Sequence, residues 1–344
     1  MRKKKHMNYD RADVKALRSG NICSRMVGGD YGDVRFDSVE QASIFFAREL
    51  DYIKTQTYDV EHPEMTAISL FPVTSEVPEG AETFTYYSYD KTGMAKIINN
   101  YATDLPRADV KGKPVTGYVK SLGDSYGYSV QEMRASRMTG KSLDVRKGES
   151  ARYAMDYAVN KIAWAGDKEH GLVGILSEDN DIPKYILSTV TVDGKEHTEF
   201  RYKNADQILE DINGMMKYVS KITKNVEKPD TLVLPSDVYI DLATRRIPDT
   251  ETTILKFVLE HAPYLKEIRE ANELQAESED INPTGSNVMF LFTNDEKKLS
   301  IEIPMHFYQY PIQEKGLEIE IPCEQRVAGM VIYYPLSGLI AEGV

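Results

Sequence analysis

The chain has 344 residues, of which 41% are hydrophobic and 28% charged, a composition typical of soluble globular proteins. Its formal net charge of −12 argues against a dedicated nucleic-acid binder, which must neutralise phosphates with a basic surface. No apolar run approaches the roughly 20 residues of a membrane helix. The two cysteines, Cys23 and Cys323, lack zinc-site spacing, so we predict no metal centre. We also predict no membrane partner and no cofactor.

The charge is unevenly distributed. Between Lys91 and Lys120 there are six basic and two acidic residues, a net charge of +4. Between Asp249 and Asp280 there are nine acidic and three basic residues, a net charge of −6. These segments are either two solvated faces or complementary surfaces on copies of the same chain.

The N-terminal third begins without clear periodicity. The basic run Arg2–Lys5 lacks the apolar segment of a signal peptide, and residues 1–37 are typical of an extended arm. A capping box, Ser38 with Gln41, then predicts a helix to about Lys54. Strands are predicted at Ile68–Val73 and Thr83–Tyr89, followed by a short helical patch around Ile97.

Residues 118–130 alternate between large and small side chains. Even positions from Tyr118 to Val130 carry large residues, and odd positions carry valine, serine or glycine, which predicts one long strand. The glycines of the small face, Gly123 and Gly127, indicate that another element lies very close to it.

The same stretch contains Gly123-Asp124-Ser125, the tripeptide that opens one class of serine esterases. A nucleophilic serine of that kind sits where a strand breaks into a sharp turn, whereas the alternation here runs straight through Ser125. His170, three residues after Asp167, is the candidate base, although a histidine beside a helix end more commonly caps carbonyl groups. We therefore keep the esterase only as a minor alternative.

Together, residues 66–130 predict a long two-stranded excursion with a basic tip. A hairpin of that length cannot bury its own apolar surface, so we expect it to lie on another molecule. The residues that we expect to contact an adjacent copy are Lys91, Lys96, Arg107, Lys111, Lys113, Gly123, Ser125 and Gly127.

The rest of the chain predicts a mixed α+β domain with no regular βαβ alternation. A long amphipathic helix is expected from Asp144 to Ala165, and a second from Asn204, a capping residue, to Ile222. Shorter helices are expected from Ser236 to Ala243 and from Thr253 to Glu260, and strands at 231–234, 288–293, 298–303, 317–321 and 330–334. The sequence has no nucleotide-binding, metalloprotease or GxSxG motif, and we predict that the protein is not an enzyme.

Several segments, in the same order along the chain, resemble the major capsid proteins of tailed bacteriophages and prophages. The resemblance begins at about Ser38 and rests on Ala47–Lys54, Asp90–Ile98, Ser121–Tyr128, Lys161–Gly174, Lys228–Pro235, Gln313–Glu318 and Val331–Pro335.

This resemblance implies the α+β fold that tailed-phage capsids share with encapsulins. Its expected parts are an N-terminal arm (1–65), an extended E-loop (66–117), a peripheral domain with a long spine helix (118–168), an axial domain (169–296) and return strands of the peripheral domain (297–344). It also implies pentamers and hexamers that form an icosahedral head around double-stranded DNA, which the acidic chain would contact weakly.

Expected partners are further copies of the chain and possible scaffolding, portal and decoration proteins. The expected location is the virion capsid, assembled in the host cytoplasm. An encapsulin-like nanocompartment shell is the main alternative, because it has the same fold but encloses a cargo enzyme.

Overall fold

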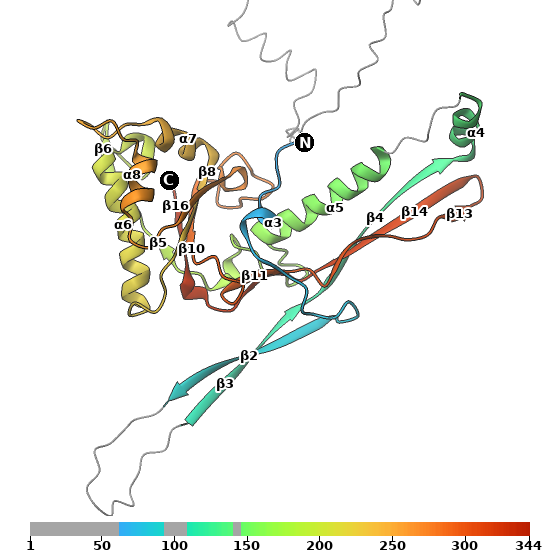
Figure 1. Cartoon of the computed structure of the whole chain (residues 1–344), viewed down its shortest axis with the longest axis horizontal. Coiled ribbons are helices and arrows are strands. Elements are labelled where there is room, and N and C mark those ends of the chain that lie inside the picture. The colour runs from blue at the N-terminus through green and yellow to red at the C-terminus, as the bar shows by residue number, and fades with distance from the viewer. Residues whose placement is uncertain (1–61, 93–108, 140–145) are drawn as a thin grey trace, which may run out of the picture. The chain divides into compact units, whose positions relative to one another are not determined.

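The computed structural model describes residues 62–92, 109–139 and 146–344, and its helices and strands belong to the unit Met65–Val344 (Figure 1). The helix predicted from Ser38 to Lys54, the patch around Ile97 and the Arg2–Lys5 run lie outside these residues. Helices and strands alternate irregularly along the chain, so the predicted α+β class is confirmed. Among the described helices, none is long and apolar enough to span a membrane.

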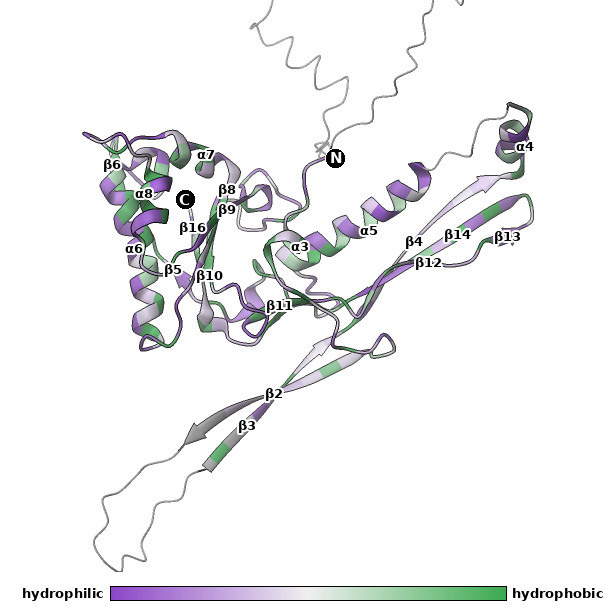
Figure 2. Cartoon of the chain, in the orientation of Figure 1, coloured by the Kyte–Doolittle hydropathy of each residue, from purple (hydrophilic) through white to green (hydrophobic). Residues whose placement is uncertain are grey.

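A five-stranded sheet with both faces buried organises the unit. Its order is β5 (Lys184–Tyr185), β16 (Gly338–Glu342), β10 (Val288–Phe292), β8 (Thr231–Pro235) and β9 (Glu267–Ala271). The central strand β10 is antiparallel to both β16 and β8. Every residue of β10 and β8 is buried, and β10 and β16 are drawn mainly green in Figure 2. A strand enclosed on both faces reads as a continuous apolar run, which is why 288–293 could be predicted.

One face of this sheet packs on the long helix α5 (Arg146–Ala165) and the short helix α3 (Ala67–Leu70). The ring centroids of Phe71 and Trp164 lie 5.1 Å apart in an edge-on arrangement, and those of Phe290 and Phe292 stack at 4.8 Å. The predicted helix is therefore confirmed over its described length. Its buried side includes Val159 and Ala163, whereas Ala158 and Ala165 are only half-buried.

The other face packs on α6 (Ala205–Ile222), α7 (Ser236–Thr244) and α8 (Ile254–His261). The predicted capping box is present: the Asn204 side chain accepts from the Gln207 N–H, and the Gln207 side chain accepts from the Asn204 N–H. The remaining short elements of this region of the chain are η1 (Glu178–Asn180), β6 (Val190–Val192), β7 (Lys195–His197), η2 (Phe200–Tyr202) and η3 (Asn272–Leu274).

Two further sheets come mainly from the C-terminal strands. In the first, β1 (Val73–Thr74) pairs with β11 (Leu299–Glu302), which pairs with β15 (Gly329–Ile332). In the second, β14 (Glu318–Val327) pairs with β12 (Met305–Gln309), β13 (Gln313–Lys315) and β4 (Lys120–Ser129). The helix α4 (Val130–Thr139) follows β4, and η4 (Pro335–Ser337) precedes β16.

A hairpin of β2 (Thr83–Thr92) and β3 (Asp109–Tyr118) forms a separate two-stranded sheet. The predicted excursion from 66 to 130 was too long, because β4 leaves the hairpin at Val119 and pairs with β14 instead. The strand predicted at Ile68–Val73 was wrong over its first half, where α3 forms. An apolar run this short does not distinguish a buried helical turn from a strand.

The buried carboxylate of Glu273 links Thr66, at the N-terminal end of the unit, to the long helix α5. Glu273 is 2% exposed and accepts hydrogen bonds from the Thr66 N–H (3.0 Å), the Thr66 hydroxyl (2.8 Å) and the Asn160 side-chain amide (2.8 Å). Asn160 in turn accepts from the Ala67 N–H at 2.9 Å. These bonds hold α3 against α5 and η3, so the segment leading into the hairpin is anchored in the core.

We predict that Asn160→Ala destabilises the unassembled protein by about 2–4 kcal/mol, because it leaves a buried carboxylate and a buried N–H short of partners. Urea unfolding monitored by circular dichroism measures this change. The exposed Asn294 provides a control, and Asn294→Ala should change the unfolding free energy by less than about 0.5 kcal/mol. Equal effects of the two substitutions would contradict the anchoring role of Asn160.

Candidate assembly surfaces

The hairpin β2–β3 is held together by aromatic rings that lie across glycines of the opposite strand. A Cβ atom placed at Gly117 would lie 2.4 Å from the ring of Phe84, its partner in the register. One placed at Gly112 would lie 2.9 Å from the ring of Tyr89, also its partner. Rings that cover glycines in this way stabilise a strand pair that has no third strand beside it.

One face of the hairpin exposes an apolar stripe. Tyr87 and Tyr89 are 61% and 65% exposed, and their rings stack with centroids 6.1 Å apart. Val110 and Tyr118, which share this face through the strand register, are 57% and 47% exposed. Exposed aromatic and aliphatic side chains on one face of a described strand pair are typical of a protein interface.

The opposite face of the hairpin contacts the rest of the unit near its base. The Tyr86 hydroxyl donates to the Ile332 carbonyl at 3.3 Å, and the Tyr86 and Tyr333 rings meet edge-on with centroids 5.0 Å apart. The Arg326 guanidinium donates to the carbonyls of Glu79 and Ala81 just before β2. These contacts fix the direction in which the hairpin leaves its own subunit.

The basic residues predicted to contact a neighbour are only partly described. Lys113 is exposed on β3 opposite Ser88. Lys91 and Lys111 lie on β2 and β3, respectively, but Lys96 and Arg107 lie outside the described residues. Contact between these basic residues and an adjacent copy therefore stays a prediction.

The strand β4 presents two different faces, as its alternation predicts. Leu122, Tyr126 and Tyr128 are half-buried toward α5, and Lys147 Nζ of that helix lies 4.6 Å from the Tyr128 ring centroid. Gly123 and Ser125 on the small face are exposed. The sequence predicts another element close to this face. At Gly123 and Ser125, no described part of this chain covers it.

The comparisons with known proteins identify the family. A family model described as "Major capsid protein" matches residues 93–344, most of the chain. The chain belongs to this family. No curated protein matches it by sequence.

Solved structures from the same kind of particle share its fold. The capsid of Myoviridae phage XM1 superimposes with a TM-score of 0.72 at 15% identity, covering 87% of this chain and 98% of that one. The capsid of a native GTA particle gives a TM-score of 0.58 at 10% identity, with coverages of 88% and 97%. A chain from Mycobacterium phage Bobi gives 0.57 at 14% identity, with coverages of 90% and 100%. The expected tailed-phage capsid fold is therefore confirmed, and this is a capsid-forming protein.

The capsid strand β4 does not offer Ser125 as a nucleophile. The strand is unbroken from Lys120 to Ser129, so the serine lacks the sharp turn of an esterase. The Lys315 ammonium pairs with the Glu320 carboxylate, and hydrogen bonding by Lys315 and Ser125 holds the pKa of that carboxyl below its usual value. The His170 ring lies 2.6 Å from Asp167 within its own turn. The family is one of structural proteins, in agreement with this geometry.

Three exposed apolar side chains on or beside β12 and β13 were missed by the sequence reasoning. Tyr308, Ile312 and Leu317 are 52%, 63% and 79% exposed. The sequence predicts a strand only at 317–321, because Pro322 normally argues against a strand flanked on both sides. The structure extends this strand, β14, to Val327. Pro322 lies where β12 gives way to β13, and its carbonyl still accepts a hydrogen bond from the Tyr310 N–H at 2.8 Å.

The two glycines of β4 should respond differently to substitution. A Cβ atom at Gly127 would lie 2.8 Å from the backbone carbonyl oxygen of Ile319, whereas one at Gly123 would lie 3.9 Å from the nearest atom. We predict that Gly127→Ala destabilises the unassembled protein by about 1–3 kcal/mol through overpacking. Gly123→Ala should change its stability by less than about 1 kcal/mol. Denaturant unfolding measures both, and equal losses would show that β4 and β14 do not approach as described.

Proposed function

We propose that copies of this chain form pentamers and hexamers, which close into an icosahedral head around double-stranded DNA. The observation that carries this proposal is the apolar stripe on β2–β3 in a chain of the capsid family. The stripe has to be covered for the hairpin to be stable, and a second copy of the chain is the partner present in highest amount during assembly.

The geometry of the hairpin favours a head-to-tail contact. Its base is attached to its own subunit through Tyr86 and Arg326, while the exposed rings of Tyr87 and Tyr89 lie on the free face. A contact made by one surface on a different surface of the next copy repeats around a ring, and the ring closes when the rotation permits. Buried tyrosines are frequent energetic centres of such interfaces.

The parts of the capsid fold can be assigned on the same basis. We propose an arm at 1–65, an E-loop at 66–117 that contains β2 and most of β3, and a peripheral domain at 118–168 and 297–344. The pairing of β4 with β14 supports joining these last two segments. The proposed axial domain, 169–296, contains β8, β9 and β10, and it shares its sheet with β16 from the C-terminal segment.

The charge of the chain suits a container for DNA. A net charge of −12 limits the number of phosphate contacts, so packaged DNA would be held weakly and without sequence preference. We propose that scaffolding, portal and decoration proteins are further partners, and that assembly takes place in the cytoplasm of the host. The basic hairpin residues, with Lys113 exposed, would meet an acidic surface of the adjacent copy.

The hairpin stripe can be tested directly. We predict that Tyr87→Ser with Tyr89→Ser lowers the yield of closed particles at least tenfold, because the interface loses two aromatic side chains in every copy. Sedimentation and negative-stain electron microscopy of the purified protein measure this yield.

The matched control keeps both rings and removes only the hydroxyl groups. Tyr87→Phe with Tyr89→Phe should assemble to within about twofold of the parent, because the apolar contact area is nearly unchanged. Normal particle yield from the serine variant, with a hairpin still folded by circular dichroism, would mean that the stripe is not an assembly surface.

A further inference from the structure

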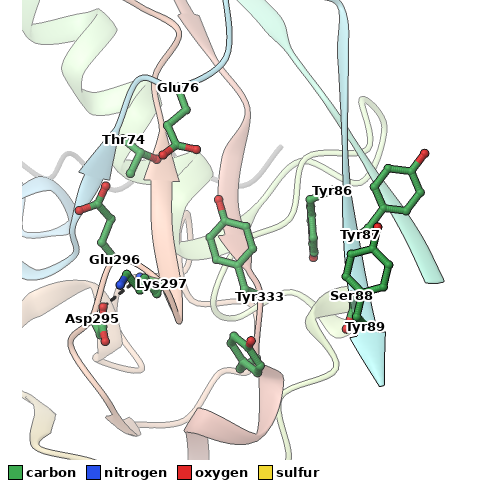
Figure 3. Close-up of a pocket in the computed structure, with 11 residues that line it drawn as sticks. Thr74, Glu76, Tyr86, Tyr87, Ser88, Tyr89, Asp295, Glu296, Lys297 and Tyr333 are labelled. Carbon is green, nitrogen blue, oxygen red and sulfur yellow. Dashed lines mark hydrogen bonds between the residues drawn. The ribbon is translucent and has the colours of Figure 1, made fainter. Parts of the chain in front are cut away.

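A groove of about 550 Å³ lies between β2 and the loop before β11, and tyrosine rings line it. Figure 3 shows Tyr86 on β2 and Tyr333 between β2 and the facing wall. Both side chains are half-buried, and their rings meet edge-on. Tyr334, the next residue, also lines the groove and is 54% exposed. The groove thus has an aromatic surface that packing holds in place.

The charged groups that line the groove are mainly carboxylates. Glu76, Asp295 and Glu296 carry three negative charges and Lys297 carries one positive charge, so the net charge of the lining is −2. Glu76 and Glu296 are exposed, and no ion pair of either is found among the described residues. Asp295 accepts a hydrogen bond from the Lys297 N–H at 3.0 Å. The described part of the chain therefore leaves a negative potential in the groove.

The carboxylates and the rings act on the same place. Burial raises the pKa of the Tyr333 hydroxyl, and the negative charges of Glu302, Glu76 and Glu296 raise it further, against a hydrogen bond with Ser300 that lowers it. The carboxylates are thus near enough to this ring to attract a cation placed against it.

One ring of the groove already binds an ammonium group of the chain itself. Lys298 Nζ lies 4.6 Å from the Tyr334 ring centroid, where the negative face of the ring attracts it. The same Nζ pairs with the Glu227 carboxylate at 2.5 Å, so Lys298 does not neutralise the groove carboxylates. The rings of Tyr86 and Tyr333 remain for a second cation.

The chemistry of the lining selects among possible ligands. Ca²⁺ and Mg²⁺ need several oxygen ligands around one point, and among the described residues no group of acidic, histidine or cysteine side chains is arranged to hold a metal ion. Phosphate groups would be repelled by Glu76 and Glu296. Two ammonium groups match the net charge of the lining, and a methylene chain between them packs against aromatic rings.

We propose that this groove binds a linear aliphatic diamine or polyamine, with its ammonium groups at the Glu76 and Glu296 carboxylates and its methylene chain along the Tyr333 ring. The inference goes beyond the proposed function and does not depend on it, because a single copy of the chain supplies every group of the site.

Calorimetric titration of the full, unassembled chain with spermidine at low salt tests the site. We expect one saturable site per chain. Glu76→Gln with Glu296→Gln should weaken the affinity about fivefold to tenfold, because each exposed ion pair contributes a modest amount. The matched control, Glu277→Gln with Glu279→Gln, removes the same charge from exposed positions outside the groove and should leave the affinity unchanged.

Variants of Tyr333 test the part played by the ring. Tyr333→Phe keeps the ring and should bind spermidine within about twofold of the parent, whereas Tyr333→Leu should bind it at least about threefold more weakly. Circular dichroism shows whether both variants keep the fold, and the glutamine variants decide the question if Tyr333→Leu does not.

Other ligands test the chemical class. Butylamine should bind at least about tenfold more weakly than 1,4-diaminobutane, because it has only one ammonium group for two carboxylates. Tighter binding of a tetralysine peptide than of spermidine would assign the groove to a polypeptide and overturn the proposal. Displacement of spermidine by an equal concentration of Mg²⁺ would also overturn it, because charge alone would then explain binding.

Two further results of the spermidine titration would overturn the proposal: no saturable binding, or equal weakening by the two glutamine pairs. Electron microscopy of the parent chain keeps the outcomes distinct. Shells from a chain that does not bind spermidine would refute this site alone, whereas spermidine binding by a chain that forms no shells would refute only the proposed function.

Discussion

The organisation of this subunit depends on one constraint: no described residue covers the apolar face of the hairpin β2–β3 that carries Tyr87 and Tyr89. Two strands form one layer, and a stable layer requires a second one packed on its face. Near the base, Tyr86 and Tyr333 supply that packing on one face. The other face carries the exposed rings of Tyr87 and Tyr89, which the proposed contact with another copy would cover.

The rest of the unit is a well-packed body to which the hairpin β2–β3 is attached. The central sheet is enclosed between two cores, with Phe290 and Phe292 in one and Met289 and Leu291 in the other. The Glu273 network holds α3 against α5 next to the segment that leads into β2. A close-packed interior deforms little under strain. The subunit can therefore keep its fold while the hairpin makes contacts with another molecule.

Local signals in the sequence predicted the local structure well. The capping box at Asn204 and the apolar spacing of α6 specify that helix without tertiary information, and the alternation in 120–129 does the same for β4. Ile68–Leu70 was assigned wrongly because a three-residue apolar run carries no period. Strand partners were beyond reach: nothing in 118–130 indicates that this strand pairs with 318–327 rather than continuing the hairpin, since pairing is decided by packing between distant segments.

The assembly surfaces were predictable only in part. The length of the excursion indicated that the hairpin must lie on something, but the stripe of Tyr87, Tyr89, Val110 and Tyr118 requires the strand register, which pairs residues up to 35 positions apart, such as Thr83 and Tyr118. The groove beside β2 is lined by residues of four segments (74–76, 86–89, 295–297 and 333–334), and no sequence pattern brings Glu76, Tyr86 and Glu296 together.

Electron cryomicroscopy of particles assembled from the purified chain tests the central claim most directly. The account predicts closed shells in which the Tyr87 and Tyr89 rings of each hairpin are covered by an adjacent copy. Closed shells in which both rings face solvent would contradict it.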